Sequence, residues 1–385
     1  MLGSFGMAVL LLPLGLALGW HLRRLADETP ESRNGTPVSA DYLEGLQLLA
    51  SGDPDRAIAA LIRAVAVDQD TIELHLTLGR LFRKRGEVDR AMRIHQHLMT
   101  REGLPAEQIN HLRLELARDY HEAGLLDRAE ALYRELVDDG MYLEEALQAL
   151  LSIFEQTRDW DNAEATARRL QTVAGRSQAR LLAHYACERA DAARASGDVG
   201  LALEHAQRAL RVDDDCVRAS LLLGELREAA QDHAGALRAY EHVAEQDLRF
   251  FPTVLPRLRR VHTETGGGDG YRRYLLAAEK HYESVAPRLA RLRLDVEDGG
   301  AVVDELAEIC RAQPTWTGLR MLAELRAEED ALAQVLHEGL EIALQSRAQY
   351  RCENCGLTPR LLFWQCPGCK QWATIRPTSD LLQDT

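Results

Sequence analysis

Aromatic residues and prolines are scarce in this sequence: Phe, Trp and Tyr make up 5% of its 385 residues, and it has 12 prolines. This scarcity disfavours a large β-sandwich and favours helices rich in Ala, Leu, Arg and Glu. Basic residues are also fewer than acidic ones: the sequence has 46 Lys and Arg and 60 Asp and Glu, which gives a formal net charge of −14. That balance argues against a general nucleic-acid-binding protein. With 46% hydrophobic residues, the chain is nevertheless too apolar to be disordered.

Charged side chains are absent between Leu2 and Leu22. A helix of that length spans roughly 30 Å, the thickness of the hydrocarbon core of a bilayer. Arg23 and Arg24 follow it, as expected for a span whose C-terminal side faces the cytoplasm. The sequence therefore predicts a transmembrane anchor over residues 1–22, with the bulk of the chain in the cytoplasm, and a polar linker over residues 23–40.

A cleaved signal peptide is the alternative interpretation of this N-terminus. It requires basic residues before the apolar run and small residues at a cleavage site. No basic residue precedes the run, although a cleavage near Gly19 fits the second requirement, so a secreted or periplasmic scaffold stays the competing hypothesis. No cysteine precedes Cys187, which excludes a lipoprotein anchor near the N-terminus.

A pattern of small residues recurs through the middle of the chain. Each copy starts at a small or apolar residue and has an alanine twelve positions later, a Leu, His, Tyr or Ala sixteen positions later and an apolar residue nineteen positions later; the copies start at Gly45, Gly79, Ala117, Leu151, Ala190 and Gly224. A spacing of about 34 residues with small side chains at such points is typical of tetratricopeptide repeats, in which two antiparallel helices touch closely. The sequence thus predicts an all-α solenoid over residues 41–346. Six repeats are clear to residue 257, and degenerate repeats follow, with helices over 286–312 and 316–346.

Basic side chains fall at groove positions of two of these repeats. The first helices of stacked repeats line a groove that binds segments of other proteins. Arg80, Arg83 and Lys84 occupy such positions in one repeat, and Arg118 and His121 occupy them in the next. We therefore expect a basic stripe suited to an acidic peptide or an anionic head group. The alternative is that these are ordinary solvated helix charges.

Four cysteines near the C-terminus have the spacing of a metal site. Cys352 and Cys355 form one CxxC pair, and Cys366 and Cys369 form a second. Two such pairs supply four thiolates to one tetrahedral ion. Sites of this kind hold zinc in zinc ribbons and iron in rubredoxins, and zinc is the favoured ion here. A disulfide framework is unlikely in a cytoplasmic chain. Because four thiolates leave no open position, the metal is expected to be structural and not catalytic.

The rest of this module, predicted over residues 347–385, is rich in aromatic residues. The segment between the cysteine pairs, residues 357–364, is long enough for a small β-hairpin. Trp364 and Trp372 flank the second pair. Because so small a module cannot bury all its aromatic rings, we expect some of them to pack against the last helices or a partner protein.

Catalytic motifs are missing from the sequence. Cys187, Cys216 and Cys310 occur singly in helical segments and are expected in the core. The thirteen histidines form no HExxH motif, and the glycines near residue 266 are not followed by the Lys-Ser/Thr of a phosphate-binding loop. No nucleophile and base form a recognisable set, so we expect a protein that is not an enzyme.

The combination of anchor, repeats and cysteine module resembles the lipopolysaccharide assembly protein B (LapB/YciM) family along essentially the whole chain. The most specific stretches are LTLGRLFRKRGEVDRAMRIHQHLM (76–99), RDYHEAGLLDRAEALYREL (118–136) and YRCENCGLTPRLLFWQCPGCKQWATIRP (350–377). The last stretch includes the cysteine spacing of the family and its flanking tryptophans. Residues after Thr378 carry no resemblance.

This resemblance implies an inner-membrane protein with a single span that acts as an adaptor in the cytoplasm. It implies that the chain promotes degradation of LpxC, the committing enzyme of lipid A synthesis, by the membrane protease FtsH. The partners it implies are FtsH, LpxC, a LapC/YejM-type inner-membrane regulator and other lipopolysaccharide synthesis or transport proteins. It also implies a metal module packed on the repeats. A rubredoxin-type electron carrier is the remaining alternative.

Overall fold

The computed structural model describes residues 40–67, 72–266, 268–328 and 330–381. The predicted anchor over 1–22 and nearly all of the predicted linker lie outside these residues. Among the described helices, none combines the length and apolar character needed to span a bilayer. The chain divides into two compact units, one up to Leu136 and one from Val137 onward.

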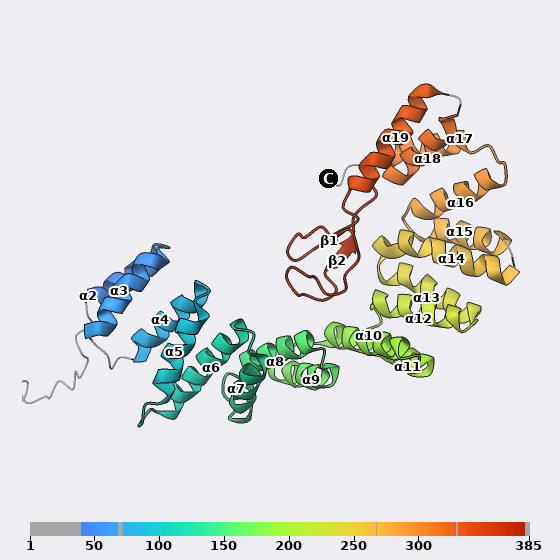
Figure 1. The fold of residues 1–385 in the computed structure, drawn as a ribbon. Coiled ribbons are helices and arrows are strands. Elements are labelled where there is room, and N and C mark those ends of the chain that lie inside the picture. Colours follow the sequence, from blue (N-terminus) through green and yellow to red (C-terminus); the bar gives the residue numbers. More distant parts are fainter. Residues whose placement is uncertain (1–39, 68–71, 267, 329, 382–385) are drawn as a thin grey trace, which may run out of the picture. The chain divides into compact units, whose positions relative to one another are not determined.

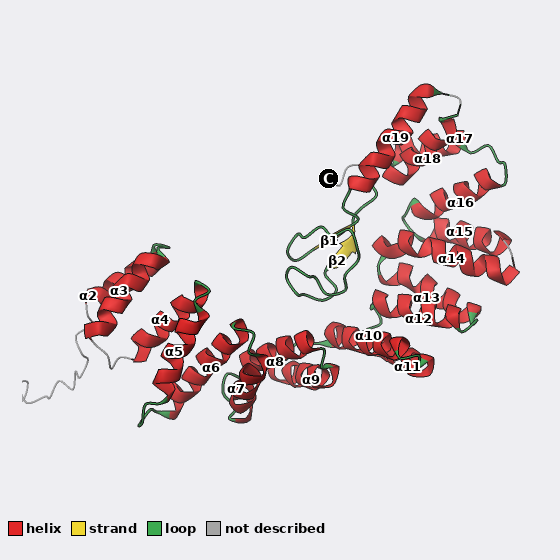
Figure 2. Ribbon diagram, in the orientation of Figure 1, coloured by secondary structure: helices red, strands yellow, loops and turns green. Residues whose placement is uncertain are grey.

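Antiparallel helices make up almost the whole described chain (Figures 1 and 2). The first unit contains α2 (Ala40–Ala50), α3 (Pro54–Val67), α4 (Ile72–Lys84), α5 (Val88–Met99), α6 (Ala106–Glu122) and most of α7 (Leu126–Asp138). The second unit begins its repeats with α8 (Leu143–Thr157), α9 (Trp160–Ala174), α10 (Ala179–Ala195), α11 (Val199–Val212), α12 (Val217–Ala229) and α13 (His233–Gln246). It continues with a 3-10 turn η1 (Leu248–Phe250), α14 (Phe251–Gly266), α15 (Gly268–His281), α16 (Ala286–Glu297), α17 (Val303–Ala312), α18 (Trp316–Arg326) and α19 (Ala331–Ser346).

Pairs of helices occupy the positions of the six predicted repeats, and the size of their contact residues explains the sequence pattern. Where the first helix carries glycine, the residue sixteen positions later on the second helix lies against its backbone. A Cβ on Gly224 would lie 2.2 Å from the ring of Tyr240, and one on Gly79 would lie 2.3 Å from His95. Glycine is required there because it lets a large buried ring lie against the backbone of the facing helix.

The predicted helices over 286–312 and 316–346 are wrong in extent, because each is interrupted. Gly299 adopts a positive φ of 81° after the end of α16, and α17 starts three residues after Gly300. Before α19, the Asp330 side chain accepts a hydrogen bond from the backbone N–H of Leu332 and caps a new helix. A shared core that includes Leu292, Leu306 and Met321 packs α16, α17 and α18 together.

The C-terminal module is mostly loop, closed by a two-stranded antiparallel sheet (Figure 2). Strand β1 (Tyr350–Cys352) pairs with β2 (Ile375–Pro377), with Arg351 opposite Arg376. The predicted hairpin over 357–364 is wrong: this segment has no regular structure. Its apolar residues Leu362 and Trp364 pack onto the core of the repeats instead of forming strand pairs.

The tail after the module returns to the repeats. The backbone N–H of Trp316 donates to the Asp380 carbonyl at 2.9 Å, and the Asp380 carboxylate lies 3.3 Å from the backbone nitrogen of Thr317. These contacts satisfy N–H groups that the first turn of α18 leaves without helical partners. The module is therefore held to the second unit on both sides, through α19 and through this tail.

Candidate metal centre and partner-binding residues

The four predicted cysteine ligands converge on one point. Their Sγ atoms all lie within 4.8 Å of one another. The Sγ atoms of Cys352 and Cys369 are 3.8 Å apart, and those of Cys355 and Cys366 are 3.7 Å apart. A tetrahedral ion with metal–sulfur bonds of about 2.3 Å places its ligands roughly 3.8 Å apart. The residues present therefore fit one tetrahedral metal ion.

Hydrogen bonds to sulfur favour the thiolate form that a metal needs. Burial by itself would raise the pKa of Cys352, but the Thr374 hydroxyl and the backbone N–H groups of Cys355 and Asn354 lower it to about 6. The Thr374 oxygen lies 3.3 Å from that sulfur. Tight turns supply these N–H groups, and each turn includes a residue with positive φ, Gly356 at 76° or Lys370 at 59°. A bound ion would serve as a cross-link between the two turns.

The module docks on the repeats through one carboxylate of α8. Glu155 accepts hydrogen bonds from Trp372 Nε1 at 3.0 Å, from Gln365 Nε2 at 2.9 Å and from the Tyr185 hydroxyl at 2.5 Å. Burial raises the pKa of Glu155 and outweighs the three hydrogen bonds, each of which lowers it. Two of the donors belong to the module and one to α10, so a single side chain joins three segments.

Stacked rings surround this carboxylate. The Trp372 ring lies 5.2 Å from His184 and 6.3 Å from Trp160, measured between centroids. Trp364 stacks on Phe250 at 5.9 Å and lies 6.1 Å from His184. His184 is buried, and this burial lowers its pKa to about 3, so the ring is neutral at physiological pH.

The prediction that some rings of the module pack against the last helices or a partner protein is wrong in the choice of helices for Trp364 and Trp372. They pack on α9, α10 and η1, because His184, Tyr185 and Phe250 present aromatic faces there. Sequence reasoning missed these residues and Glu155, since no local pattern distinguishes them from ordinary helical positions.

Ion pairs fix a second side of the module. Arg249 Nη1 lies 2.6 Å from Glu353 Oε1, and Arg376 Nε lies 3.0 Å from Asp247 Oδ2. Hydrogen bonds from the backbone and side chain of Arg249 lower the pKa of Asp247 against the effect of its burial. The module thus has polar contacts at two places on the repeats.

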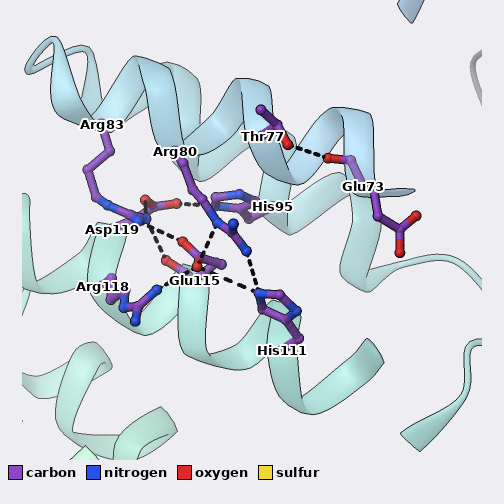
Figure 3. Close-up of polar contacts among 9 residues, drawn as sticks. All are labelled: Glu73, Thr77, Arg80, Arg83, His95, His111, Glu115, Arg118 and Asp119. Carbon is purple, nitrogen blue, oxygen red and sulfur yellow. Dashed lines mark hydrogen bonds and ion pairs between the residues drawn. The ribbon is translucent and has the colours of Figure 1, made fainter. Parts of the chain in front are cut away.

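Three arginines of the predicted basic stripe, Arg80, Arg83 and Arg118, belong to an ion-pair cluster around two buried carboxylates (Figure 3). Arg83 lies 2.6 Å from both Glu115 and Asp119, whose side chains are fully buried. Arg80 and Arg118 pair with Glu115 at 2.9 and 2.6 Å. Much of the charge of these arginines is therefore compensated inside the unit.

The cluster continues beyond the predicted residues. His95 Nδ1 lies 2.5 Å from Asp119 Oδ2, and Arg80 Nη2 donates to His111 Nε2 at 2.5 Å. His121 packs edge-on against Tyr133, and its burial lowers its pKa. Lys84 is exposed. Partner binding by Arg80, Arg83, Lys84, Arg118, His121, Trp364 and Trp372 stays a prediction.

Comparison with known proteins gives matches to both parts of the chain. Residues 350–377 match the family described as a rubredoxin metal binding domain, and residues 48–102 and 187–247 match tetratricopeptide repeat families. The chain is 32% identical to lipopolysaccharide assembly protein B of Escherichia coli strain K12 over 97% of its own length and 98% of that relative. The identity to the Haemophilus influenzae protein of the same name is also 32%, over 96% and 98%.

A solved structure shares the helical fold. In the structure of Naa15/Naa10 bound to HypK-THB, one chain aligns with a TM-score of 0.50 at 15% identity, covering 81% of this chain and 47% of that one. At this identity the likeness concerns the fold alone.

Proposed function

Because this chain belongs to the lipopolysaccharide assembly protein B family, we propose that it is an inner-membrane adaptor that promotes degradation of LpxC by the membrane protease FtsH. In this role it also scaffolds other lipopolysaccharide synthesis and transport proteins and responds to a LapC/YejM-type regulator. The identity across 97% of the chain, which includes both the repeats and the cysteine module, is the observation that carries the proposal.

A more general function follows without naming any partner. Tetratricopeptide repeats are scaffolds that bind segments of other proteins, and the relatives are named for lipopolysaccharide assembly. The chain is therefore a non-enzymatic adaptor, and its relatives support a role in lipopolysaccharide assembly.

A membrane tether gives this adaptor a physical advantage. An anchor over residues 1–22 confines the repeats to the surface on which a membrane protease works. Confinement raises the effective concentration of the two proteins without any new contact. The repeats then need only a modest affinity for a client to deliver it.

The metal module contributes a rigid surface to the adaptor. We propose zinc as the ion, because zinc has no redox chemistry and four thiolates close its coordination. Its binding is worth on the order of 10 kcal/mol in small domains. That stabilisation keeps Trp364, Gln365 and Trp372 in the positions that contact the repeats.

The proposal is tested by depleting the protein in its cell of origin and measuring LpxC turnover after synthesis is blocked. LpxC is expected to persist longer, and re-expression of the full chain is expected to restore its turnover. A variant with Cys352→Ser and Cys355→Ser, present at the same level, is expected to restore it poorly. Unchanged LpxC turnover on depletion would refute the adaptor function.

Two measurements separate the alternatives. The intact mass of the membrane-purified protein is expected to include residues 1–22, whereas cleavage near Gly19 would indicate a secreted scaffold. Purified protein is expected to be colourless and to contain one zinc per chain; a red, redox-active iron centre would indicate an electron carrier.

A further inference from the structure

A hollow of about 300 Å³ opens where the metal module meets α8 and α9. We call it the seam pocket. Its walls include Trp160 from the repeats and Leu362, Phe363, Trp364 and Trp372 from the module. Its volume is at the lower end of the roughly 300–1,000 Å³ found for ligand pockets. Because both parts supply walls, the seam pocket exists only while the module is docked.

The acidic groups of the seam pocket already have partners. Glu155 accepts the three hydrogen bonds that dock the module. Glu188 lies 2.8 Å from Arg218, a buried arginine of α12. What the seam pocket offers to a ligand is therefore aromatic surface, with Phe363 40% exposed at its edge.

Arg158 supplies a positive charge at the rim. It ends α8 in the left-handed conformation, with a φ of 57°, and its side chain is exposed. Within the described part of the chain, it forms no ion pair. Among the charged residues that line the seam pocket, Arg158 is therefore the one whose charge is left uncompensated.

A second hollow extends the first. It has a volume of about 470 Å³, shares Arg158 and Trp160 with the seam pocket, and continues along α9, α10 and α11. Its other walls mix apolar residues with polar ones that include Arg189, Ser196 and His205. Two carboxylates also line it, and both have partners: Asp159 accepts hydrogen bonds from Asn162, and Asp161 pairs with Arg189. Two adjoining hollows, one aromatic and one polar, suit an extended chain better than a compact small molecule.

We propose that the seam pocket binds an acidic peptide segment of a client protein, which inserts one large apolar side chain against Trp160 and Trp372. A carboxylate next to that side chain pairs with Arg158, and the peptide backbone continues into the polar hollow. Buried aromatic anchors beside an arginine are the usual source of binding energy at protein interfaces. A concave pocket favours this occupant over a lipid surface, which would need the rings to protrude. The inference rests on the adaptor function proposed above and names its docking site.

The proposal gives the metal centre a purpose in binding. Ligation of the four cysteines holds the turn that carries Trp372 and Gln365, and these residues hold the walls of the seam pocket against Glu155. Loss of the metal is therefore expected to remove the peptide site while the repeats remain folded.

The test uses the full chain, loaded with zinc, in neutral phosphatidylcholine nanodiscs. Its tryptophans are replaced by fluorotryptophan, and the NMR signals are assigned with single Trp→Phe variants. The probe is the blocked pentapeptide Gly-Glu-Phe-Glu-Gly. The signals of Trp160 and Trp372 are expected to shift saturably, and the Trp316 signal is expected to stay. Peptides with Lys for Glu, or Ala for Phe, are expected to bind at least about tenfold more weakly, equivalent to roughly 1.4 kcal/mol.

Variants separate binding from folding. Arg158→Gly removes the charge at a position whose positive φ suits glycine, so binding is expected to fall about tenfold with no loss of thermal stability. Arg158→Lys keeps the charge and is expected to retain most binding. Phe363→Ala reduces the apolar wall at an exposed position and is expected to weaken the probe as well.

Several outcomes would overturn the proposal. One is equal binding of the lysine peptide, and another is unchanged binding by the Arg158→Gly variant. A third is a shift of Trp160 and Trp372 on adding phosphatidylglycerol to the nanodiscs, with none on adding peptide, which would assign the surface to anionic lipid. If the peptide fails while depletion still stabilises LpxC, the pocket is refuted and the adaptor function stands. If LpxC turnover does not respond, the adaptor function fails whatever the peptide does.

Discussion

Replacing Glu155 with Ala is expected to weaken the docking of the metal module on the repeats without unfolding either part. The carboxylate accepts hydrogen bonds from Trp372, Gln365 and Tyr185. Removing it leaves all three donors without this acceptor. Two of the three belong to the module, so the loss falls mainly on docking.

The size of the effect follows from these contacts. A hydrogen bond to a charged group contributes about 1.5–3 kcal/mol, and a buried donor left without a partner costs about 1–3 kcal/mol. Glu155 lines the seam pocket, so water reaches part of the site and replaces part of what is lost. We therefore expect docking to weaken by about 2–4 kcal/mol, which raises the opening equilibrium at least roughly thirtyfold. Glu155→Gln keeps one acceptor oxygen and is expected to have an intermediate effect.

Hydrogen–deuterium exchange followed by mass spectrometry measures this opening in the zinc-loaded full chain. Faster exchange is expected in the module and in the facing parts of α8 and α10, with zinc content unchanged. Glu188→Gln is the matched control: this residue lines the same pocket, but its partner is Arg218 of α12, so docking should not change. Unaltered protection in Glu155→Ala would refute the reasoning that this carboxylate makes a large contribution to docking.

Four further predictions concern the metal, pH and packing. Cys352→Ser or strong chelation is expected to unfold the module, measured as loss of zinc and of tryptophan signal dispersion, while helical circular dichroism changes little. Folding lowers the pKa of His184 to about 3 from an unfolded value near 6.5. The contribution of the neutral ring to the free energy of unfolding is therefore complete above pH 6.5 and declines as the pH falls, by up to about 1.4 kcal/mol per pH unit. His184→Phe is expected to flatten that slope in denaturant titrations between pH 7 and 5. Gly224→Ala forces a methyl group against the Tyr240 ring and is expected to lower the free energy of unfolding, measured by chemical denaturation, by about 1–3 kcal/mol. Gly339 lies in open space on α19, so Gly339→Ala is expected to be neutral or to stabilise by up to about 1 kcal/mol. Arg83→Met leaves Glu115 and Asp119 buried without their main cation and is expected to destabilise the first unit by about 3–5 kcal/mol. Arg80 is more exposed, so Arg80→Met is expected to cost much less. Equal melting curves for the two variants would contradict the central role assigned to Arg83.

Much of the fold follows from spacing within the sequence. The relation between Gly224 and Tyr240 repeats at a fixed offset in each helix pair, so the repeats are visible without any structure. The cysteine pairs are equally local, because each turn brings its own two sulfurs together. Both features depend on residues fewer than twenty positions apart.

The contacts that join distant segments were not predictable in the same way. Glu155 looks like any other helical glutamate until Trp372 is placed beside it. Glu115 and Asp119 likewise convert Arg83 from an expected groove residue into a buried ion-pair partner, because α6, which carries both carboxylates, packs on α4. The break after α16 was missed because the apolar periodicity continues on both sides of Gly299 and Gly300. For Glu155 and Arg83 the deciding neighbour lies on another element.

The hydrogen bond between Glu155 and Trp372 joins residues 217 positions apart. During synthesis at about 5–20 residues per second, α8 and α10 leave the ribosome roughly 10–40 s before their partner exists. Through that interval Glu155, His184, Tyr185 and Trp160 face solvent or a chaperone. Docking of the module can begin only after the chain is complete to Trp372, so it is a late step. A chain truncated before the module therefore lacks the side chains that cover this aromatic surface.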